Sequence, residues 1–261
     1  MKYYIVDAFT EKTFGGNPAG VCILDNSIEH SIMQKIASEN NLSETAFVTK
    51  NKNCEDCYDL KWFTPKAEID LCGHATLASA FVIFNYIDKN IDKIKFSTLS
   101  GVLEVTKDKE SYTMNFPNRM PKKVNISNDI IEAIGKAPLE AYLSRDLILI
   151  YNKEDDIKSL NPDFSKLELL TDGIGIVVTS IGKNEDFISR CFFPKLEVNE
   201  DLVTGSSHSS LIPLWSAKLK KNKMITKQLS DREGILVCEI DGDRVKISGK
   251  ARLYLKGEIY I

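Results

Sequence analysis

The sequence predicts an α+β protein of two pseudo-symmetric lobes, each a strongly curved sheet or barrel around a central apolar helix. Three observations lead to this prediction. Residues 63–79 (FTPKAEIDLCGHATLAS) resemble residues 192–210 (FFPKLEVNEDLVTGSSHSS), which indicates an internal repeat. In each copy a glycine, Gly73 or Gly205, opens a run of small and apolar residues that is typical of a buried helix. Segments that alternate between apolar and polar residues surround both copies and predict strands.

The repeat keeps almost the same register over half of the chain. Identical residues recur at an offset of 129 (63 to 192), and the two glycines follow at an offset of 132 (73 to 205). A third match, SGVL at 100–103 with EGIL at 233–236, has an offset of 133 (100 to 233). Three registers that drift so little indicate a duplicated unit. We therefore expect Gly73 and Gly205 to face each other across one cleft between the lobes.

Local patterns predict the elements of the first lobe. Lys2–Phe9 alternates and is rich in Tyr, Ile and Val, which favour strands, and Gly15–Pro18 is typical of a turn. The segment GHATLASAFVIFNY at 73–86 is apolar on nearly all sides, which predicts a helix buried inside the sheet. The expected order is a strand at 2–9, a strand at 19–24, a helix at 31–40, strands at 46–48 and 58–64, the helix at 73–86, and strands at 96–98, 101–106 and 112–116.

The composition changes at residues 118–124, which follow Pro117, carry Pro121 and two lysines, and are the candidate crossing between lobes. This places the first lobe at 1–117 and the second at 118–250, with a C-terminal strand at 251–261 that completes the first lobe. Ser127 is expected to cap a short helix that ends at Gly135. The remaining elements are expected as strands at 147–151, 175–180 and 186–193, a helix at 206–221, and strands at 235–240, 244–248 and 251–255.

Composition excludes several functional classes. The net charge is −3 and 43% of the residues are hydrophobic, so the chain has no overall attraction for nucleic acid or for anionic membranes. No apolar run reaches the length of a membrane span, and a cytoplasmic location is expected. Six cysteines in a chain of this size predict reduced thiols. Cys54 and Cys57 have CxxC spacing but no histidine nearby, so a polar loop rather than a zinc site is expected.

The helix starts at Gly73 and Gly205 are candidate anion sites. Backbone N–H groups at a helix N-terminus favour a carboxylate or a phosphate. The alternative is that both glycines only permit tight turns. His74 and His208 lie at the same two helix starts, where the helix dipole would keep them neutral and suited to hydrogen bonding or proton transfer. A capping or packing role is the alternative for each histidine.

Glu44 is the candidate proton-transferring carboxylate. It lies in a polar loop between Leu42 and Ala46, and such a carboxylate suits the uptake and return of a proton. A solvated loop glutamate is the alternative. Asp201, with Glu200 as its rival, lies where the second copy of the repeat is enlarged, and repeats diverge where function is added.

The repeat also bears on thiol chemistry. Cys72 precedes Gly73, as a racemase thiol would, but the residue before Gly205 is Thr204. A two-thiol racemase would therefore lack its second thiol.

At these residues the sequence resembles the PhzF family, the phenazine-biosynthesis isomerase-like proteins, which are related in fold to diaminopimelate epimerase. The resemblance rests on blocks in the family's order: VDAFT (6–10) with GNPA (16–19), LSETAF (42–47), FTP (63–65), CGHAT (72–76) and EDLVTGS (200–206). The family's pattern has proline where Leu202 stands and usually alanine at Ser207. Neither change touches a group that transfers protons.

The resemblance implies a diaminopimelate epimerase-like fold, a site between the lobes, no cofactor, no metal, and commonly a homodimer. By motif position Glu44 would shuttle a proton on a small carboxylic acid. The assigned residues are, for catalysis, Glu44, His74 and Asp201, and, for substrate binding, Asn17, Ser43, Gly73, Gly205 and Ser206. Two further functions stay open, namely a non-catalytic binding protein of the same fold and a one-thiol racemase or epimerase that uses Cys72.

Overall fold

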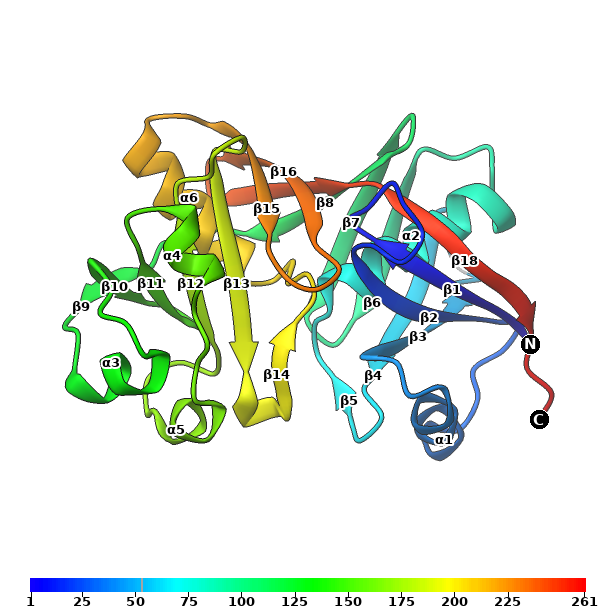
Figure 1. Ribbon diagram of the computed structural model, residues 1–261. Coiled ribbons are helices and arrows are strands. Elements are labelled where there is room, and N and C mark those ends of the chain that lie inside the picture. The colour runs from blue at the N-terminus through cyan, green and yellow to red at the C-terminus, as the bar shows by residue number, and fades with distance from the viewer. Residues whose placement is uncertain (53) are drawn as a thin grey trace. The chain divides into compact units, whose positions relative to one another are not determined.

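The computed structural model describes residues 1–52 and 54–261, and the chain divides into two compact units (Figure 1). The first unit contains residues 1–116 and 246–261, and the second contains residues 117–245. The chain returns to the first unit at Lys246, inside a strand, whereas the sequence places the return at residue 251. The strand that crosses this boundary is β17 (Arg244–Gly249).

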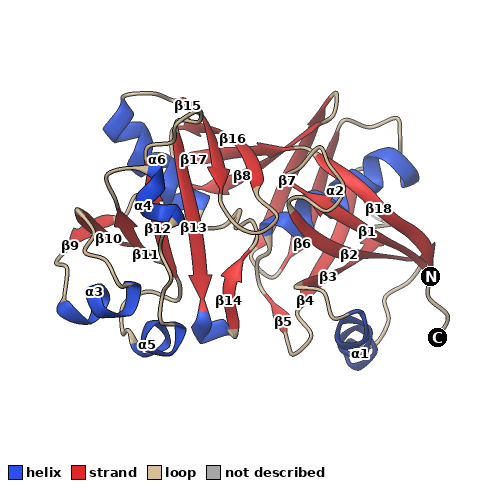
Figure 2. Cartoon of the chain, viewed as in Figure 1, coloured by secondary structure: helices blue, strands red, loops and turns tan. Residues whose placement is uncertain are grey.

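The first unit is built mainly from strands, drawn in red in Figure 2. Its elements are β1 (Lys2–Ala8), β2 (Asn17–Leu24), α1 (His30–Asn40), β3 (Glu44–Lys50), β4 (Cys57–Phe63), β5 (Glu68–Ile69), α2 (Gly73–Val82), the π-helix η1 (Ile83–Ile87), β6 (Lys93–Thr98), β7 (Gly101–Asp108), β8 (Ser111–Pro117) and, from the end of the chain, β18 (Ala251–Glu258).

The strands of the first unit wrap around α2. β1 pairs antiparallel with both β2 and β18, β2 runs parallel to β3, and β4 pairs antiparallel with β3 and parallel with β6. Nine of the ten residues of α2 are buried, and the helix packs against β1, β2, β3 and β18. The predicted apolar helix inside a curved sheet is therefore confirmed for this unit.

Helix α1 covers the outer face of the same sheet. Met33, Ile36 and Ala37 recur at helical spacing and pack in one cluster with Phe47 and Phe63. The helix ends at Asn41, which adopts the left-handed conformation (φ 49°) and donates its backbone N–H to the carbonyl of Ala37.

The second unit has a similar set of elements. They are β9 (Lys122–Val124), α3 (Asn128–Ile134), β10 (Glu140–Leu143), β11 (Leu147–Ile150), α4 (Glu154–Lys158), α5 (Phe164–Leu169), β12 (Ile176–Ser180), β13 (Phe187–Phe193), the 3₁₀ helix η2 (Pro194–Leu196), β14 (Val198–Asp201), α6 (His208–Leu219), β15 (Lys223–Gln228) and β16 (Gly234–Asp241).

Strand pairing repeats in the two units. In the first, β4 pairs antiparallel with β5 and parallel with β6, and β6 pairs antiparallel with β7. In the second, β13 pairs antiparallel with β14 and parallel with β15, and β15 pairs antiparallel with β16. Helices α2 and α6 occupy corresponding places in these patterns, and nine of the twelve residues of α6 are buried. The pseudo-symmetric architecture predicted from the repeat is confirmed.

Three short helices cover the second unit, of which the sequence predicts one. α3 has the expected caps, since the Ser127 hydroxyl accepts from the backbone N–H of Ile130 and Gly135 adopts a left-handed conformation. α4 and α5 were not predicted, because five or six residues are too few to display helical periodicity. α5 nevertheless carries a recognisable cap, in which the side chain of Asp163 accepts from the backbone N–H of Lys166.

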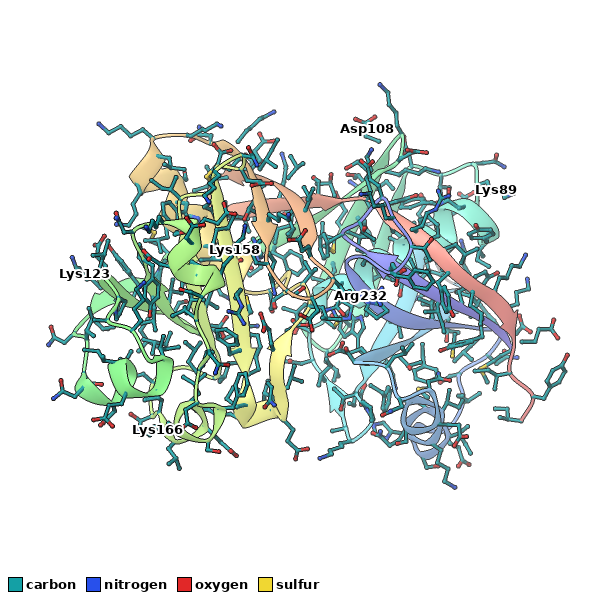
Figure 3. All side chains as sticks on the ribbon, viewed as in Figure 1. Lys89, Asp108, Lys123, Lys158, Lys166 and Arg232 are labelled. Atoms are coloured by element: carbon teal, nitrogen blue, oxygen red, sulfur yellow. A yellow bond between two sulfur atoms is a disulfide. The ribbon has the colours of Figure 1, made fainter. Side chains whose placement is uncertain are left out.

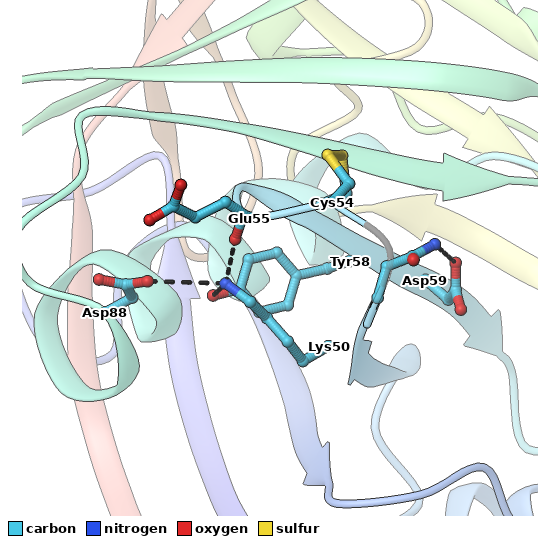
Figure 4. Close-up of a disulfide and its surroundings, with 8 residues drawn as sticks. Lys50, Cys54, Glu55, Tyr58, Asp59 and Asp88 are labelled. Atoms are coloured by element: carbon cyan, nitrogen blue, oxygen red, sulfur yellow. Dashed lines mark hydrogen bonds and ion pairs between the residues drawn. A yellow bond between two sulfur atoms is a disulfide. The ribbon is translucent and has the colours of Figure 1, made fainter.

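The expectation of six reduced cysteines is wrong at one site. Cys54 and Cys57 form a disulfide in the turn before β4, as Figure 4 shows, because the turn brings their Cα atoms to 5.3 Å. The ammonium group of the neighbouring Lys50 contacts the carbonyl of Glu55 and the hydroxyl of Tyr58. The four other cysteines are free and buried. The turn is the predicted polar loop, but its two thiols are oxidised.

Charged residues lie on the surface of both units. Lys89, Lys123 and Lys166 are exposed and are labelled among the side chains of Figure 3.

Within the described residues, no helix is both long enough and apolar enough to cross a bilayer.

Candidate active site

Two parallel strands and one helix bring the candidate residues of the first unit together. Strands β2 and β3 are parallel and pair Ala19 with Glu44, so Asn17 and Glu44 both lie where these strands begin. A glycine is required at position 16, because its φ is +61° and a Cβ would lie 2.0 Å from the carbonyl oxygen of Ala8. Glu44 is the first residue of β3 rather than a loop residue, since the preceding loop ends at Ser43.

A buried cluster forms where α2 begins beside these strands. Nε2 of His74 lies 2.9 Å from Oε2 of Glu44, and Nδ1 of His74 lies 3.2 Å from the amide nitrogen of Asn17. The sulfur of Cys72 lies 3.6 Å from the same Nδ1. The side chains of His74 and Glu44 are 5% and 16% exposed, so the carboxylate is the member of the pair that solvent or a ligand can reach. Its Oε2 is buried beside the imidazole.

The protonation states within this cluster differ from the expectation for a helix start. Burial favours neutral His74, but negative charge on Cys72, when that thiol ionises, and on the carboxylate of Glu44 outweighs burial and holds the pKa of His74 well above its usual value. This direction is opposite to the neutral imidazole predicted for a helix start, and it favours an imidazolium paired with Glu44. The contact with Asn17 suits either state, because an amide group offers both a donor and an acceptor.

Cys72 is a neutral thiol in this environment. Burial and the nearby carboxylate of Glu44 raise the pKa of the Cys72 sulfur, and His74 opposes this increase only in part. The thiolate is the form that acts as a base or nucleophile. The surroundings of Cys72 therefore disfavour the reactive thiolate.

The ligand atoms of Glu44, Cys72 and His74 all lie within 4.8 Å of one another, so these three groups could hold a divalent metal ion. Metal binding would require both the thiol and the imidazolium to lose a proton. Both groups retain their protons in the ion-paired cluster, since their pKa values are raised. Protons therefore compete with a metal ion at this position.

The backbone at the start of α2 contributes positive potential. Gly73 is buried as the first helical residue, and the first-turn bond runs from the N–H of Thr76 to the carbonyl of Cys72. The N–H groups before Thr76 point out of the helix end, where they can bind an anion. Ser43, the other predicted contact in this unit, is exposed next to Glu44.

In the second unit, Asp201 is held by a buried hydrogen-bond network. The hydroxyl of Thr204 donates to Oδ2 of Asp201 at 2.6 Å. Gln228, at the end of β15, accepts from the backbone N–H of Thr204 at 2.8 Å and donates to the carbonyl of Asp201 at 2.7 Å. Gln228 is fully buried, so these bonds are shielded from water.

The start of α6 is tied to β11 by charged side chains. Gly205 and Ser206 form the turn that precedes the helix, and the hydroxyl of Ser207 donates to Oδ2 of Asp146 at 2.8 Å. Arg145 makes two hydrogen bonds to the carboxylate of Asp146, at 2.7 and 2.9 Å, and a third to the hydroxyl of Ser207 at 3.2 Å. The carboxylate of Asp146 is 1% exposed and its charge is balanced by Arg145.

His208, the second helix-start histidine, is neutral as predicted. Burial lowers its pKa to about 4, against a smaller opposing effect of its hydrogen bond to the carbonyl of Thr204. Nδ1 of His208 donates to that carbonyl at 2.8 Å. The ring therefore supports the same turn as Gln228. The third histidine, His30, contacts Glu68 at the surface.

The two units differ at the position of Glu44. Glu44 begins β3 in the first unit, whereas the corresponding strand β12 begins with Ile176. Thr204, which precedes Gly205, makes hydrogen bonds where Cys72 carries a thiol. The pseudo-symmetric fold thus carries an acid–base pair in one unit only.

Sequence reasoning missed Arg145, Asp146, Ser207 and Gln228. One signal was available, because Arg145 and Asp146 directly precede the buried strand β11, which pairs parallel with β12 as β2 pairs with β3 in the first unit. The sequence does not reveal the contacts of Gln228, because a single glutamine at the end of a strand belongs to no recognisable motif.

The fold and this cluster define a class of protein with two repeated α+β units, one of which carries a buried carboxylate–imidazolium pair at a helix start. The chain matches the model of the family described as "Phenazine biosynthesis-like protein" over residues 6–257. It belongs to this family, known as PhzF.

Relatives of this family cover the whole chain. An uncharacterized isomerase of Pseudomonas aeruginosa is 43% identical over 261 residues, which cover 100% of this chain and 99% of the relative. A PhzF-family protein of Enterococcus faecalis has a solved structure with a TM-score of 0.97 and 48% identity, covering 100% of this chain and 99% of that one. A putative PhzC/PhzF protein of Clostridium difficile gives a TM-score of 0.95 and 55% identity, with both chains covered completely.

The fold extends to racemases. A probable proline racemase from Agrobacterium radiobacter has a TM-score of 0.64 at 8% identity, covering 100% of this chain and 93% of the racemase. At this identity the likeness shows the fold alone. The epimerase-like architecture predicted from the sequence is therefore confirmed.

Proposed function

We propose that this protein is a cofactor-independent isomerase that moves a proton on a small carboxylic acid. The observation that carries the proposal is the ion pair of Glu44 and His74 at the start of α2, with Nε2 and Oε2 at 2.9 Å. A positioned carboxylate beside a cation can take a proton from carbon and return it without a cofactor. The name "uncharacterized isomerase" of the Pseudomonas aeruginosa relative supports the reaction class.

In the proposed reaction the carboxylate of Glu44 removes a proton from a carbon of the substrate. The electron pair of that C–H bond becomes delocalised over the adjacent unsaturated system. Glu44, now a carboxylic acid, returns the same proton to another carbon, and one double bond has moved. The imidazolium of His74 stabilises the negative charge during the transfer, because it is buried where charges interact strongly.

The substrate carboxylate is assigned to the backbone N–H groups at the helix starts. Gly73 provides this position in the first unit, and Gly205 with Ser206 provides it in the second. Asn17 and Ser43 are the further substrate contacts of the first unit. We assign Asp201 to the substrate as well, since Thr204 and Gln228 fix its orientation.

Two alternatives are less well supported. A one-thiol racemase needs a thiolate, and the pKa of Cys72 is raised by its burial. A non-catalytic binding protein has no use for a buried carboxylate and imidazolium, which cost free energy to desolvate. Both observations favour the isomerase.

The experiment is a screen in heavy water. Small unsaturated carboxylic acids are incubated with the protein, and deuterium uptake at carbon is measured by NMR and mass spectrometry. We expect at least one acid to exchange or to rearrange, and Glu44→Gln to abolish this reaction. Acids that bind, as judged by calorimetry, but never exchange would establish the binding protein instead. The homodimer expected for the family is tested separately, by light scattering.

A further inference from the structure

A cavity lies in the first unit, at the end of α2 opposite to His74. Its volume is about 620 Å³, within the range of small-molecule sites. Four separate parts of the chain form its wall: the end of α2 with η1, the loop after β1, the turn between β7 and β8, and the beginning of β18. The proposed reaction uses none of these parts.

Aromatic rings form one side of this cavity. Phe81 lies at the end of α2, with its ring centroid 6.0 Å from that of Tyr86 and 5.7 Å from that of Tyr112. α2 continues here as the π-helix η1, and π-helices often mark functional sites. The side chain of Asn85 donates to the carbonyl of Phe81 and to the hydroxyl of Tyr112, both at 2.7 Å. The rings are therefore held in place before any ligand binds.

Three basic side chains lie at the rim, the solvent-exposed edge of this cavity. Of the three basic residues that line the cavity, Lys250 forms an ion pair with Glu11 at 2.5 Å. Among the described residues, Lys109 and Arg252 have no carboxylate within ion-pair distance, and both are exposed. Glu110 is the remaining acid of the lining, so the wall has a net charge of +1 (three cations and two carboxylates). A cavity with aromatic sides and unpaired cations is complementary to a planar anion.

We propose that this cavity is a second binding site, for a planar aromatic anion such as an arene carboxylate. The ring of the ligand packs against Phe81 and Tyr86, where offset or edge-to-face contact is favourable. Its carboxylate lies at the rim and pairs with Arg252, whose planar guanidinium suits bidentate binding, or with Lys109. A cationic ligand is disfavoured by the same charges. This proposal is independent of the proposed isomerase reaction.

Three probes separate the features of the site. Binding of 2-naphthoate to the full chain is measured by calorimetry and mapped by amide NMR shifts. We expect shifts around residues 81–86 and 250–253 rather than around Glu44. The neutral 2-naphthylmethanol and the non-aromatic cyclohexanecarboxylate should each bind roughly tenfold more weakly, because one lacks the charge and the other the flat ring. Equal binding of all three probes, or shifts confined to other regions, would overturn the proposal.

Matched variants test the rim. Arg252→Gln and Lys109→Gln should each weaken 2-naphthoate about fivefold or more by removing a charge-assisted contact. Lys89→Gln removes an exposed lysine that does not line the cavity and should leave the affinity unchanged. If the two rim variants bind as the wild type does, the cations do not recognise the ligand. A dimer that buries the cavity and excludes 2-naphthoate would also contradict the proposal.

Discussion

The two helix-start histidines show how local neighbours set the charge of a residue. His74 and His208 are both buried at the start of an apolar helix. His74 has a carboxylate at 2.9 Å, and its pKa is held well above the usual value. His208 has only a backbone carbonyl, and burial lowers its pKa to about 4. Burial accounts for the second case, whereas in the first case the neighbouring charges outweigh burial.

His208 predicts a loss of stability in acid. In the folded state it binds no proton down to a pH of about 4, whereas in the unfolded chain it is protonated below about 6.5. The unfolded state therefore binds more protons between these values, and stability falls as the pH falls. Over this window the loss is on the order of 3 kcal/mol.

The measurement is urea unfolding at a series of pH values from 7 to 4. His208→Asn should reduce the slope of stability against pH in this window. A slope in His208→Asn that is parallel to that of the wild type would show that His208 is not the group responsible. His74 is protonated in both states below pH 6.5 and contributes little to the slope there.

His74 predicts a loss of activity at alkaline pH. Its imidazolium stabilises the transferred charge in the proposed reaction, and its pKa is raised. As the pH rises through that pKa, the imidazolium becomes neutral and deuterium exchange into the responsive acid should fall. In His74→Gln the exchange should be slower, and this alkaline decline should disappear. A decline that persists unchanged in His74→Gln would assign it to another group.

At the scale of elements, the segment between β14 and α6 depends on Gln228. This side chain bonds the carbonyl of Asp201 and the backbone N–H of Thr204. Gln228→Met keeps the shape but leaves both backbone groups buried without these partners. We expect a loss of about 3 kcal/mol in the free energy of unfolding, measured in urea. The control is Gln34→Met, since Gln34 makes one bond, to the carbonyl of Thr64, and should lose about 1 kcal/mol or less. Equal losses would contradict the special role of Gln228.

Periodicity predicted the elements that have a strong pattern. The buried helix α2, the capped helix α3 and the alternating strands of both units were found because apolar spacing or a cap residue identifies them. The two-residue β5 and the short α4 and α5 are too short to display a periodic apolar pattern. The disulfide was missed because the pairing of Cys54 with Cys57 depends on the turn geometry and not on their spacing alone.

At the scale of the whole molecule, both ends of the chain belong to one unit. All seven residues of β1 pair with β18, and the terminal amino group of Met1 bonds the carbonyl of Ile259. Deletion of residues 251–261 should therefore expose the edge of β1 and unfold the first unit. Deletion of 260–261 alone removes two exposed residues and should preserve folding. Circular dichroism during heating distinguishes the two, and equal melting of both deletions would contradict this account.

The internal repeat located the candidate site because it singled out two helix starts and their differences. The sequence singled out Glu44 and His74 from separate motifs, and the structure adds the ion pair between them. The repeat could not reveal that Arg145 and Asp146 anchor the start of α6, since their contact with Ser207 joins residues far apart in the chain. The role of Asp201 at the substrate stays a prediction.

The central claim is that Glu44 carries the proton and that Cys72 does not. Its most direct test is deuterium exchange from heavy water into the acid found by the screen, with Glu44→Gln compared with Cys72→Ala. Because loss of a general base typically costs roughly 10²- to 10⁴-fold in rate, Glu44→Gln should abolish measurable exchange while binding the acid as before. Cys72→Ala should exchange within about twofold of the wild type, since its thiol is neutral and buried. Exchange that survives in Glu44→Gln but stops in Cys72→Ala would contradict the account and identify a thiol racemase.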